Sequence, residues 1–483
     1  MRIRVILYLL GILNLFLGLF MLIPTLISLL YGEAATMAIF ASSLITTGIG
    51  GVLFLTCRGQ KVDVSLREGF AITAMTWISA GLFGALPYFL SGALPHFVDA
   101  YFEAISGFTT TGASVFKSVE NLPHGILFWR SLTHWIGGMG IILLSIAILP
   151  FLGIGGMQLY RAEITGVGVS SEKLAPRLME VVILFGKVYL AITIAELIAL
   201  IWAGMGPFDA LIHTFGTVAT GGFSNRNISA EYYHNPLIEI ILTVFMFIAA
   251  TNFALHANIL RHGPKIYWHN SEFRFYLGLQ LVAIILVALD LYFSVFDSLM
   301  SSLRYASFHV VTITTSTGFS SADYMRWPSF SQLILLMLMF IGGSTGSTTG
   351  GIKCLRAVIL FKQGYKELRH LIHPHAVINI KLGTRVVPNE VVTAAIGFTF
   401  LYIAIFFIAS IAMAFLGLDI VSSISSVAAT LGNIGPGLGI VGPYSNYSEI
   451  PFIGKWLLIG CMLIGRLEIY TILILFTPTF WKG

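Results

Sequence analysis

The sequence predicts an all-α polytopic membrane protein in which four pseudo-symmetric repeats surround one central axis, with two further transmembrane helices at the N-terminus. Three observations support this fold class. Hydrophobic residues make up 57% of the 483 residues and charged residues only 10%, whereas an average soluble domain carries about 25% charged residues. Long apolar runs recur along the whole chain, and four Thr/Gly segments stand at matching places between these runs.

The composition indicates that the bilayer is the solvent of this chain. A mean hydropathy of +0.88 and the low charge exclude a soluble enzyme, a nucleic-acid-binding protein and a disordered protein. The first 24 residues are apolar for longer than a signal peptide requires, so we expect a retained first helix. Cys57, Cys354 and Cys461 lie far apart without metal-ligand spacing and are interpreted as free thiols.

Ten apolar runs are long enough to cross a membrane, because a crossing helix needs about 20 residues. They lie near 5–30, 36–56, 69–90, 124–150, 181–204, 236–260, 275–296, 329–360, 391–416 and 452–477. Shorter stretches near 99–111, 209–220, 303–316 and 420–432 are predicted to be re-entrant. Of the 27 Lys and Arg residues, 19 fall at the two ends and in every second loop. This bias places both termini in the cytoplasm.

Each re-entrant stretch runs into a similar short loop. The aligned glycines are 110, 96 and 117 residues apart. The unit is therefore a span, a half-helix, a Thr/Gly loop and a second span, with repeats at 67–150, 151–262, 263–370 and 371–483 after the N-terminal pair at 1–66. The candidate residues are Thr110, Thr111, Gly112, Thr220, Gly221, Gly222, Ser316, Thr317, Gly318, Asn433, Ile434 and Gly435.

Parallel repeats are related by an axis along the membrane normal, so the four loops should meet at one point. Carbonyl oxygens there could replace the water shell of a cation, and the half-helix C-termini carry partial negative charge. The sequence therefore predicts a cation filter, with coincidental turns as the alternative. Glu103, His213 and His309 each lie nine residues before their glycine. They could couple protons or, more simply, bond buried backbone.

The eighth run contains ten consecutive small residues, 342–351. Irregular backbone at membrane depth must line a cavity or be buried in protein, so we expect a gate, with a close-packed crossing as the alternative. A phosphate-binding loop is excluded because Ile352 separates the glycines from Lys353. Arg466, midway along the last run, is expected to face the same path, with a structural contact to Glu468 or to a loop carbonyl as the alternative. The candidate gate residues are Gly343, Ser344, Thr345, Gly346, Ser347, Thr348, Thr349, Gly350 and Arg466.

Several motifs resemble the TrkH/TrkG potassium-uptake subunits of the Trk/Ktr/HKT superfamily over nearly the whole chain. They include FTTTGAS (108–114), ATGGFS (219–224), FIGGSTGSTTGGIK (340–353), LGNIGPGLG (431–439) and GRLEIYT (465–471). The resemblance implies a K⁺-translocating subunit of the bacterial inner membrane with one filter glycine per repeat. It also implies a homodimer, a cytoplasmic Rossmann-type nucleotide-binding ring of the TrkA kind, and K⁺ as the transported ion without an organic cofactor.

Two functions remain open at this point. One is a gated, channel-like K⁺ pore, and the other is a secondary transporter with alternating access, coupled to H⁺ or Na⁺. Four parallel repeats favour the first, because transporters of the second kind usually have two repeats, often inverted. Paired catalytic carboxylates and nucleophile motifs are not found in the spans, so an enzyme is not expected. The basic loop at 361–383 could contact anionic lipid, dock a soluble subunit, or both.

Overall fold

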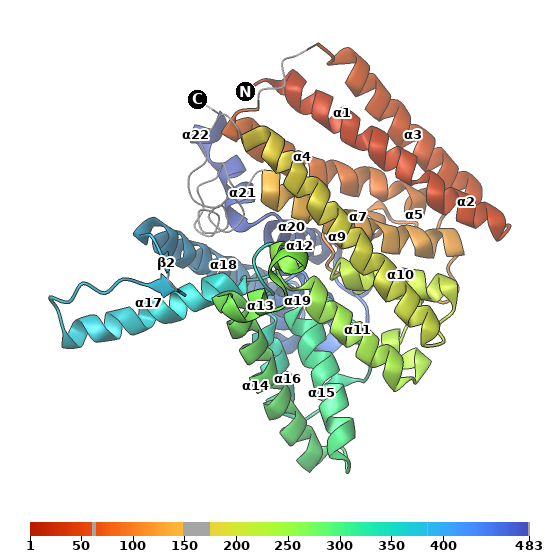
Figure 1. Ribbon diagram of the computed structural model, residues 1–483. Coiled ribbons are helices and arrows are strands. Elements are labelled where there is room, and N and C mark those ends of the chain that lie inside the picture. Colours follow the sequence, from red (N-terminus) through yellow and green to blue (C-terminus); the bar gives the residue numbers. More distant parts are fainter. Residues whose placement is uncertain (60–63, 148–173, 384, 482–483) are drawn as a thin grey trace.

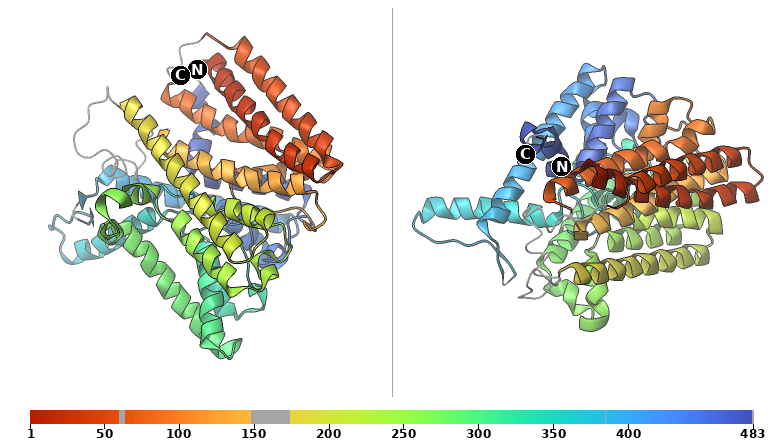
Figure 2. Two further views of the ribbon diagram at one scale, coloured as in Figure 1. Left: turned by 45° about the vertical axis from the view of Figure 1, so that its right-hand side comes forward. Right: turned by 90° about the horizontal axis from the view of Figure 1, so that it is seen from above.

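The computed structural model describes residues 1–59, 64–147, 174–383 and 385–481 and is dominated by helices (Figure 1). In these ranges six helices are long and apolar enough to cross a membrane, and two sharply bent helix pairs raise that number to eight. The predicted all-α membrane fold is confirmed. Both chain termini lie close together on one side of the molecule (Figure 2).

The N-terminal helices pack together at the edge of the molecule, beside the first repeat (Figures 1 and 2). An ion pair between Arg2 and Glu68, 2.8 Å long, holds the start of the first helix against the start of the first repeat. Glu68 also completes a capping box with Ser65, which fixes where that repeat begins. The N-terminal helices are α1 (Ile3–Phe20), α2 (Leu22–Leu30) and α3 (Ala35–Thr56).

Four times the chain runs through a long helix and then a short helix that stops inside the protein. The short helices begin at clear signals, such as Pro207 at the first turn of the second and the Asp419 side chain that caps the fourth. The long helices are α4 (Leu66–Gly84) with α5 (Leu86–Leu90), α9 (Leu174–Trp202), α14 (Ser271–Ser294) and α18 (Asn389–Phe415). The short helices are α6 (Phe97–Phe108), α10 (Pro207–Val218), α15 (Leu299–Thr314) and α19 (Ile420–Leu431).

The second long helix of each repeat lies next to the centre, and three of these four helices are interrupted. Helix α7 (His124–Ala147) is continuous. Helices α11 (Pro236–Ala249) and α12 (Phe253–His262) meet at 98°, and α20 (Phe452–Arg466) meets α21 (Ile469–Leu473) at 119°. In the third repeat, α16 (Ser329–Leu338) and α17 (Cys354–Ile372) are separated by an irregular segment.

The sixth and tenth predicted spans are therefore bent, which the sequence did not indicate. At the first bend the Asn252 side chain accepts a hydrogen bond from Ala254 N (2.8 Å) and so starts a new helix. The carbonyl of Ala250 is left free to accept from Ser344 N (2.9 Å). At the second bend Glu468 adopts a φ of 58°. Contacts with the third repeat, which hydropathy does not register, determine both bends.

Helix α17 projects away from the other helices, and a hairpin lies beside its middle, where Lys362 Nζ donates to Lys381 O (Figures 1 and 2). The strands β1 (Lys381–Leu382) and β2 (Arg385–Val386) pair antiparallel. The predicted repeat boundary at 370/371 falls inside the last turn of α17, and the boundary at 150/151 lies outside the described residues. The remaining short helices are α13 (Lys265–His269) and α22 (Pro478–Trp481).

Candidate functional site

The four short helices all end in the same backbone conformation. Thr110, Thr220, Ser316 and Asn433 have φ values of 50°, 54°, 52° and 54°. The next residue then donates its N–H to the carbonyl five residues back, which is the Schellman pattern that terminates a helix. These bonds are Thr111 to Ser106 (2.8 Å), Gly221 to Gly216 (2.7 Å), Thr317 to Thr312 (2.9 Å) and Ile434 to Ala429 (2.8 Å).

The glycine that follows in each repeat lies against the next repeat, and the four loops form a closed ring. Gly112, Gly222, Gly318 and Gly435 have φ values of 79°, 78°, 85° and 95°, which disfavour any side chain. A Cβ on each glycine would meet a carbonyl oxygen of the following repeat, and on the fourth it would meet the first. These pairs are Gly112 with Gly221 O, Gly222 with Thr317 O, Gly318 with Ile434 O and Gly435 with Thr111 O.

This ring has the chemistry of a site for a dehydrated cation. Carbonyl oxygens of four equivalent residues close the contacts of the ring, and the four short helices end beside it with the partial negative charge of their C-termini. In the part of the chain that the structure describes, no group of three His, Cys, Asp or Glu side chains could hold a metal ion. The ring itself offers backbone carbonyl oxygens as candidate ligands.

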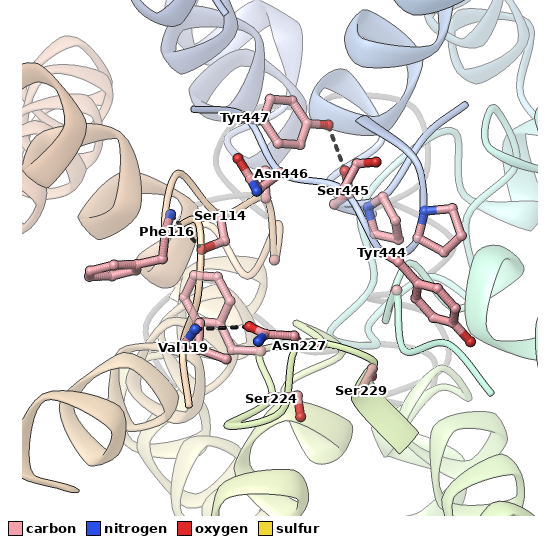
Figure 3. A pocket seen from close by; sticks show the side chains of 18 of the residues that line it. Ser114, Phe116, Val119, Ser224, Asn227, Ser229, Tyr444, Ser445, Asn446 and Tyr447 are labelled. Atoms are coloured by element: carbon pink, nitrogen blue, oxygen red, sulfur yellow. Dashed lines mark hydrogen bonds between the residues drawn. The ribbon is translucent and has the colours of Figure 1, made fainter. Parts of the chain in front are cut away.

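A cavity of about 110 Å³ lies directly against the ring, and all four glycines line it (Figure 3). Figure 3 shows Ser114, Asn227 and Tyr447 around this cavity. The Tyr447 hydroxyl donates to the carbonyl of Gly435 (2.6 Å) and so holds the fourth loop from outside. The cavity is a partly polar space beside the ring.

A buried ion pair behind the ring joins the first two loops. Arg130 Nε donates to Glu103 Oε1 (2.8 Å), and the two side chains are 3% and 0% exposed. The same guanidinium donates to Ser224 O (3.1 Å) and Ser114 Oγ (3.2 Å). The sequence interpretation noted Glu103 but missed Arg130, although a lone Arg in the apolar run 124–150 was a visible signal.

The equivalent residues of the second and third repeats also bond the outgoing loops. His213 Nε2 lies 3.1 Å from Ser224 Oγ, and His309 Nε2 lies 3.1 Å from the carbonyl of Ala322. His213 Nδ1 also lies 2.8 Å from the carbonyl of Asp209, so both histidines contact buried backbone, which agrees with the simpler of the two expected roles.

The loop of the second repeat is also held from its outer side by Asp209, at the start of α10. Its carboxylate accepts hydrogen bonds from Asn225 Nδ2 (2.6 Å), Tyr233 Oη (2.8 Å) and Arg226 Nη2 (3.1 Å). Burial alone would raise the pKa of Asp209, but these bonds outweigh burial and lower the pKa below its ordinary 3.8.

The irregular segment 342–351 lies on the other side of the ring and contacts three repeats. Gly350 N donates to Ser316 Oγ (2.9 Å), at the end of α15, and Thr348 Oγ1 donates to the carbonyl of Val218 (3.3 Å), at the end of α10. Ser344, Ser347, Thr348 and Thr349 are at most 2% exposed. The small residues expected at a gate are thus packed beneath the ring rather than facing lipid.

Arg466 holds this segment from the fourth repeat. It ends α20 rather than lying midway along a straight helix, because the chain bends there. Its side chain is buried, Nη1 donates to Thr348 O (2.6 Å), and Nη2 donates to Gly137 O (3.4 Å) on α7. Arg466 therefore links the first, third and fourth repeats.

A second anchor of the segment was missed in the sequence. Glu272 Oε1 accepts from Thr345 N (2.6 Å), Thr345 Oγ1 (3.0 Å) and Leu355 N (3.1 Å). Its position at the polar start of α14 made it look like an ordinary membrane-boundary residue. Arg356, just after the segment, pairs with Glu468 Oε2 (2.6 Å) at the bend of the last span.

Several apolar helices, four half-helices that end inside the protein and a ring of carbonyls are together typical of cation-transport membrane proteins. Residues 35–482 match the family TrkH, described as a cation transport protein. The chain is 42% identical to the Trk system potassium uptake protein TrkH of Salmonella typhimurium and to that of Escherichia coli, over the full length of each.

The fold also matches the crystal structure of the potassium transporter TrkH from Vibrio parahaemolyticus, with a TM-score of 0.92, 38% identity and complete coverage of both chains. The chain belongs to the TrkH family, which is a family of transporters and not of enzymes.

Proposed function

We propose that this protein takes up K⁺ through a channel-like pore whose filter is the ring of four loops. The observation that carries this proposal is the closed contact of each ring glycine with a carbonyl of the next repeat. Such a ring can replace the water shell of a cation. Relatives of 42% identity over the full length are named potassium uptake proteins, which supports K⁺ as the transported ion.

Reversal potentials of the purified protein in liposomes test this function. Under separate K⁺, Na⁺ and pH gradients, the reversal potential should follow the K⁺ gradient and ignore the pH gradient. A potential that follows the pH or Na⁺ gradient at fixed K⁺ would instead support coupled, alternating-access transport.

The segment 342–351 is proposed to be the gate. It is buried directly beneath the ring, and Arg466 places a guanidinium group beside it. A fixed positive charge on the route of a cation raises the barrier to passage. Opening then requires the segment to leave its two anchors, Arg466 and Glu272, and α17 begins directly after it at Cys354. A partner that pulls α17 would move the segment.

A cytoplasmic, Rossmann-type nucleotide-binding ring is proposed as that partner. The projecting, basic helix α17 offers it a handle, and the positive-inside bias, with Arg2 and Arg4 at the N-terminus, supports a cytoplasmic location for this side. The loop at 151–180 is proposed as a second contact of the ring, and it lies mostly outside the described residues. Replacing Lys362, Lys366 and Arg369 by Gln should weaken co-purification with the ring. Arg326→Gln, between α15 and α16, is the matched control.

A homodimer is also proposed, and the apolar side chains of α17 support it. Phe361, Leu368 and Leu371 are 67%, 63% and 80% exposed on a helix that carries several charges. Exposed apolar patches of this kind mark interaction sites. Cross-linking of single cysteines placed at these positions, in native membranes, should trap dimers. A chain that stays monomeric at every position would contradict this interface.

A further inference from the structure

A large apolar cavity lies between the N-terminal helices and the first repeat. Its volume is about 470 Å³, and its walls come from α1, α4 and α7 together with the last residue of α6. Trp77 and Leu17 form buried parts of the wall, whereas Phe16 is 60% exposed at its rim. The cavity is therefore a crevice that is open toward the surrounding bilayer along α1.

The apolar lining of this crevice favours an apolar ligand over water. Its lining is aliphatic and aromatic apart from Thr76, and cavities of this kind stay dry and bind apolar molecules. Along α1 the lining extends from Leu9 to Phe20. These eleven steps correspond to about 16 Å of helix, and one leaflet is about half of the ~30 Å hydrocarbon core. The crevice thus has the length of one acyl chain.

Two arginines mark one end of the crevice. Arg4 lies five residues before the first lining residue of α1, Leu9, and Arg67 lies five residues before the first lining residue of α4, Ile72. Both side chains are exposed. The Arg2–Glu68 ion pair holds the starts of the two helices at the same level. Positive charges at the end of an apolar crevice match an anionic lipid headgroup.

We infer that this crevice binds one acyl chain of an anionic phospholipid from the leaflet on the side of the chain termini, with its headgroup near Arg4 and Arg67. The bound chain would lie against Phe108, the last residue of α6, and Gly137, whose carbonyl accepts a hydrogen bond from Arg466. The lipid site is therefore separate from the ring, but it touches the end of α6 and the residue that binds Arg466.

Native mass spectrometry of the full chain in detergent tests this site, with dioleoyl phosphatidylglycerol as the probe and dioleoyl phosphatidylcholine as the comparison lipid. Wild-type protein should retain one phosphatidylglycerol per chain. Leu13→Trp and, from the other wall, Ala80→Phe fill the crevice and should lower this occupancy at least fivefold. Leu19→Trp adds the same bulk to α1 outside the crevice and should leave the occupancy unchanged.

The headgroup half of the site is tested separately. Arg4→Gln with Arg67→Gln should reduce the preference for phosphatidylglycerol over phosphatidylcholine about threefold or more, and Arg274→Gln, at the exposed start of α14, should not. Thermal melting of each variant shows whether it is folded. If one of the two crevice variants is misfolded, the other one provides the test. Equal lipid retention by the wild type and both folded crevice variants would overturn the proposal. A change in oligomeric state with unchanged lipid retention would also overturn it, by showing the crevice to be a contact between copies.

Discussion

Replacing a ring glycine should impair ion preference by an amount that depends on the repeat. Any side chain at these positive φ values costs about 1–2 kcal/mol of backbone strain, which is common to all four positions. The contacts differ. A Cβ on Gly435 would lie 2.6 Å from Thr111 O, so a shift of about 0.4 Å restores the 3.0 Å that real contacts keep. A Cβ on Gly222 would need more than twice that shift from Thr317 O.

The expected order follows from these shifts. If the strain of about 1–2 kcal/mol in one repeat is transferred to ion preference, the K⁺/Na⁺ permeability ratio changes by a factor of about 5–30. The closer contact at Gly222 adds to this common effect, so Gly222→Ala should change the ratio more than Gly435→Ala does. Gly112→Ser and Gly318→Ser should likewise admit more Na⁺, because their contacts are as close as that of Gly222.

Reversal potentials in liposomes under bi-ionic K⁺ and Na⁺ conditions measure this ratio. Gly417→Ala is the matched control, because Gly417 also has positive φ, at 100°, but a Cβ there would meet nothing within 4 Å. This variant should lose stability without changing the ratio. An unchanged ratio in both Gly222→Ala and Gly318→Ser, or a larger effect at Gly435 than at Gly222, would refute the ring as the filter.

Three further outcomes are expected. Arg466→Ala and Glu272→Gln should each raise partner-independent K⁺ flux with nearly unchanged ion preference, since each weakens an anchor of the segment 342–351. The control Arg326→Ala should leave the flux unchanged. Lower flux in both folded variants would place the gate elsewhere. Arg130→Lys should lower thermal stability by about 1.5–3 kcal/mol for each charged hydrogen bond lost, and an unchanged melting temperature would contradict the role of this pair. Because the pKa of Asp209 is lowered on folding, its contribution to stability is present above pH 3.8 and is lost as the pH falls through the folded pKa. The melting temperature of Asp209→Asn should therefore fall less in acid than that of the wild type. Equal falls in the two proteins would refute this contribution.

The parts of the fold that hydropathy and local spacing determine could be predicted from the sequence. The four short helices begin and end within a few residues of their predicted bounds, because each lies between two long apolar runs and ends at a Thr/Gly loop. The equivalence of Glu103, His213 and His309 was visible as a shared spacing. What these side chains contact was not visible, since the partners of Glu103 include Arg130, 27 residues away.

Other features depend on contacts between distant segments and could not be predicted. A β-branched Thr110 with a φ of 50° is an outlier that no propensity favours, and the closed ring holds it in place. The bends after α11 and α20 arise because Ala250 and Arg466 bond a segment roughly 100 residues away in the chain. Glu272 could not be recognised either, because its two hydrogen bonds to Thr345 and one to Leu355 join residues more than 70 positions apart.

The contacts of the ring have a direction. Each glycine faces a carbonyl of the repeat that follows it, in chain order, and the fourth glycine faces the first repeat. Bulk added in one repeat therefore presses on its successor and not on its predecessor. Suppressors of a Gly222 substitution should accordingly arise in the third repeat, around Thr317, rather than in the first. Because the four repeats differ in sequence, each neighbouring pair has its own contact partners, which beside Gly318 are Ile434 and Pro436.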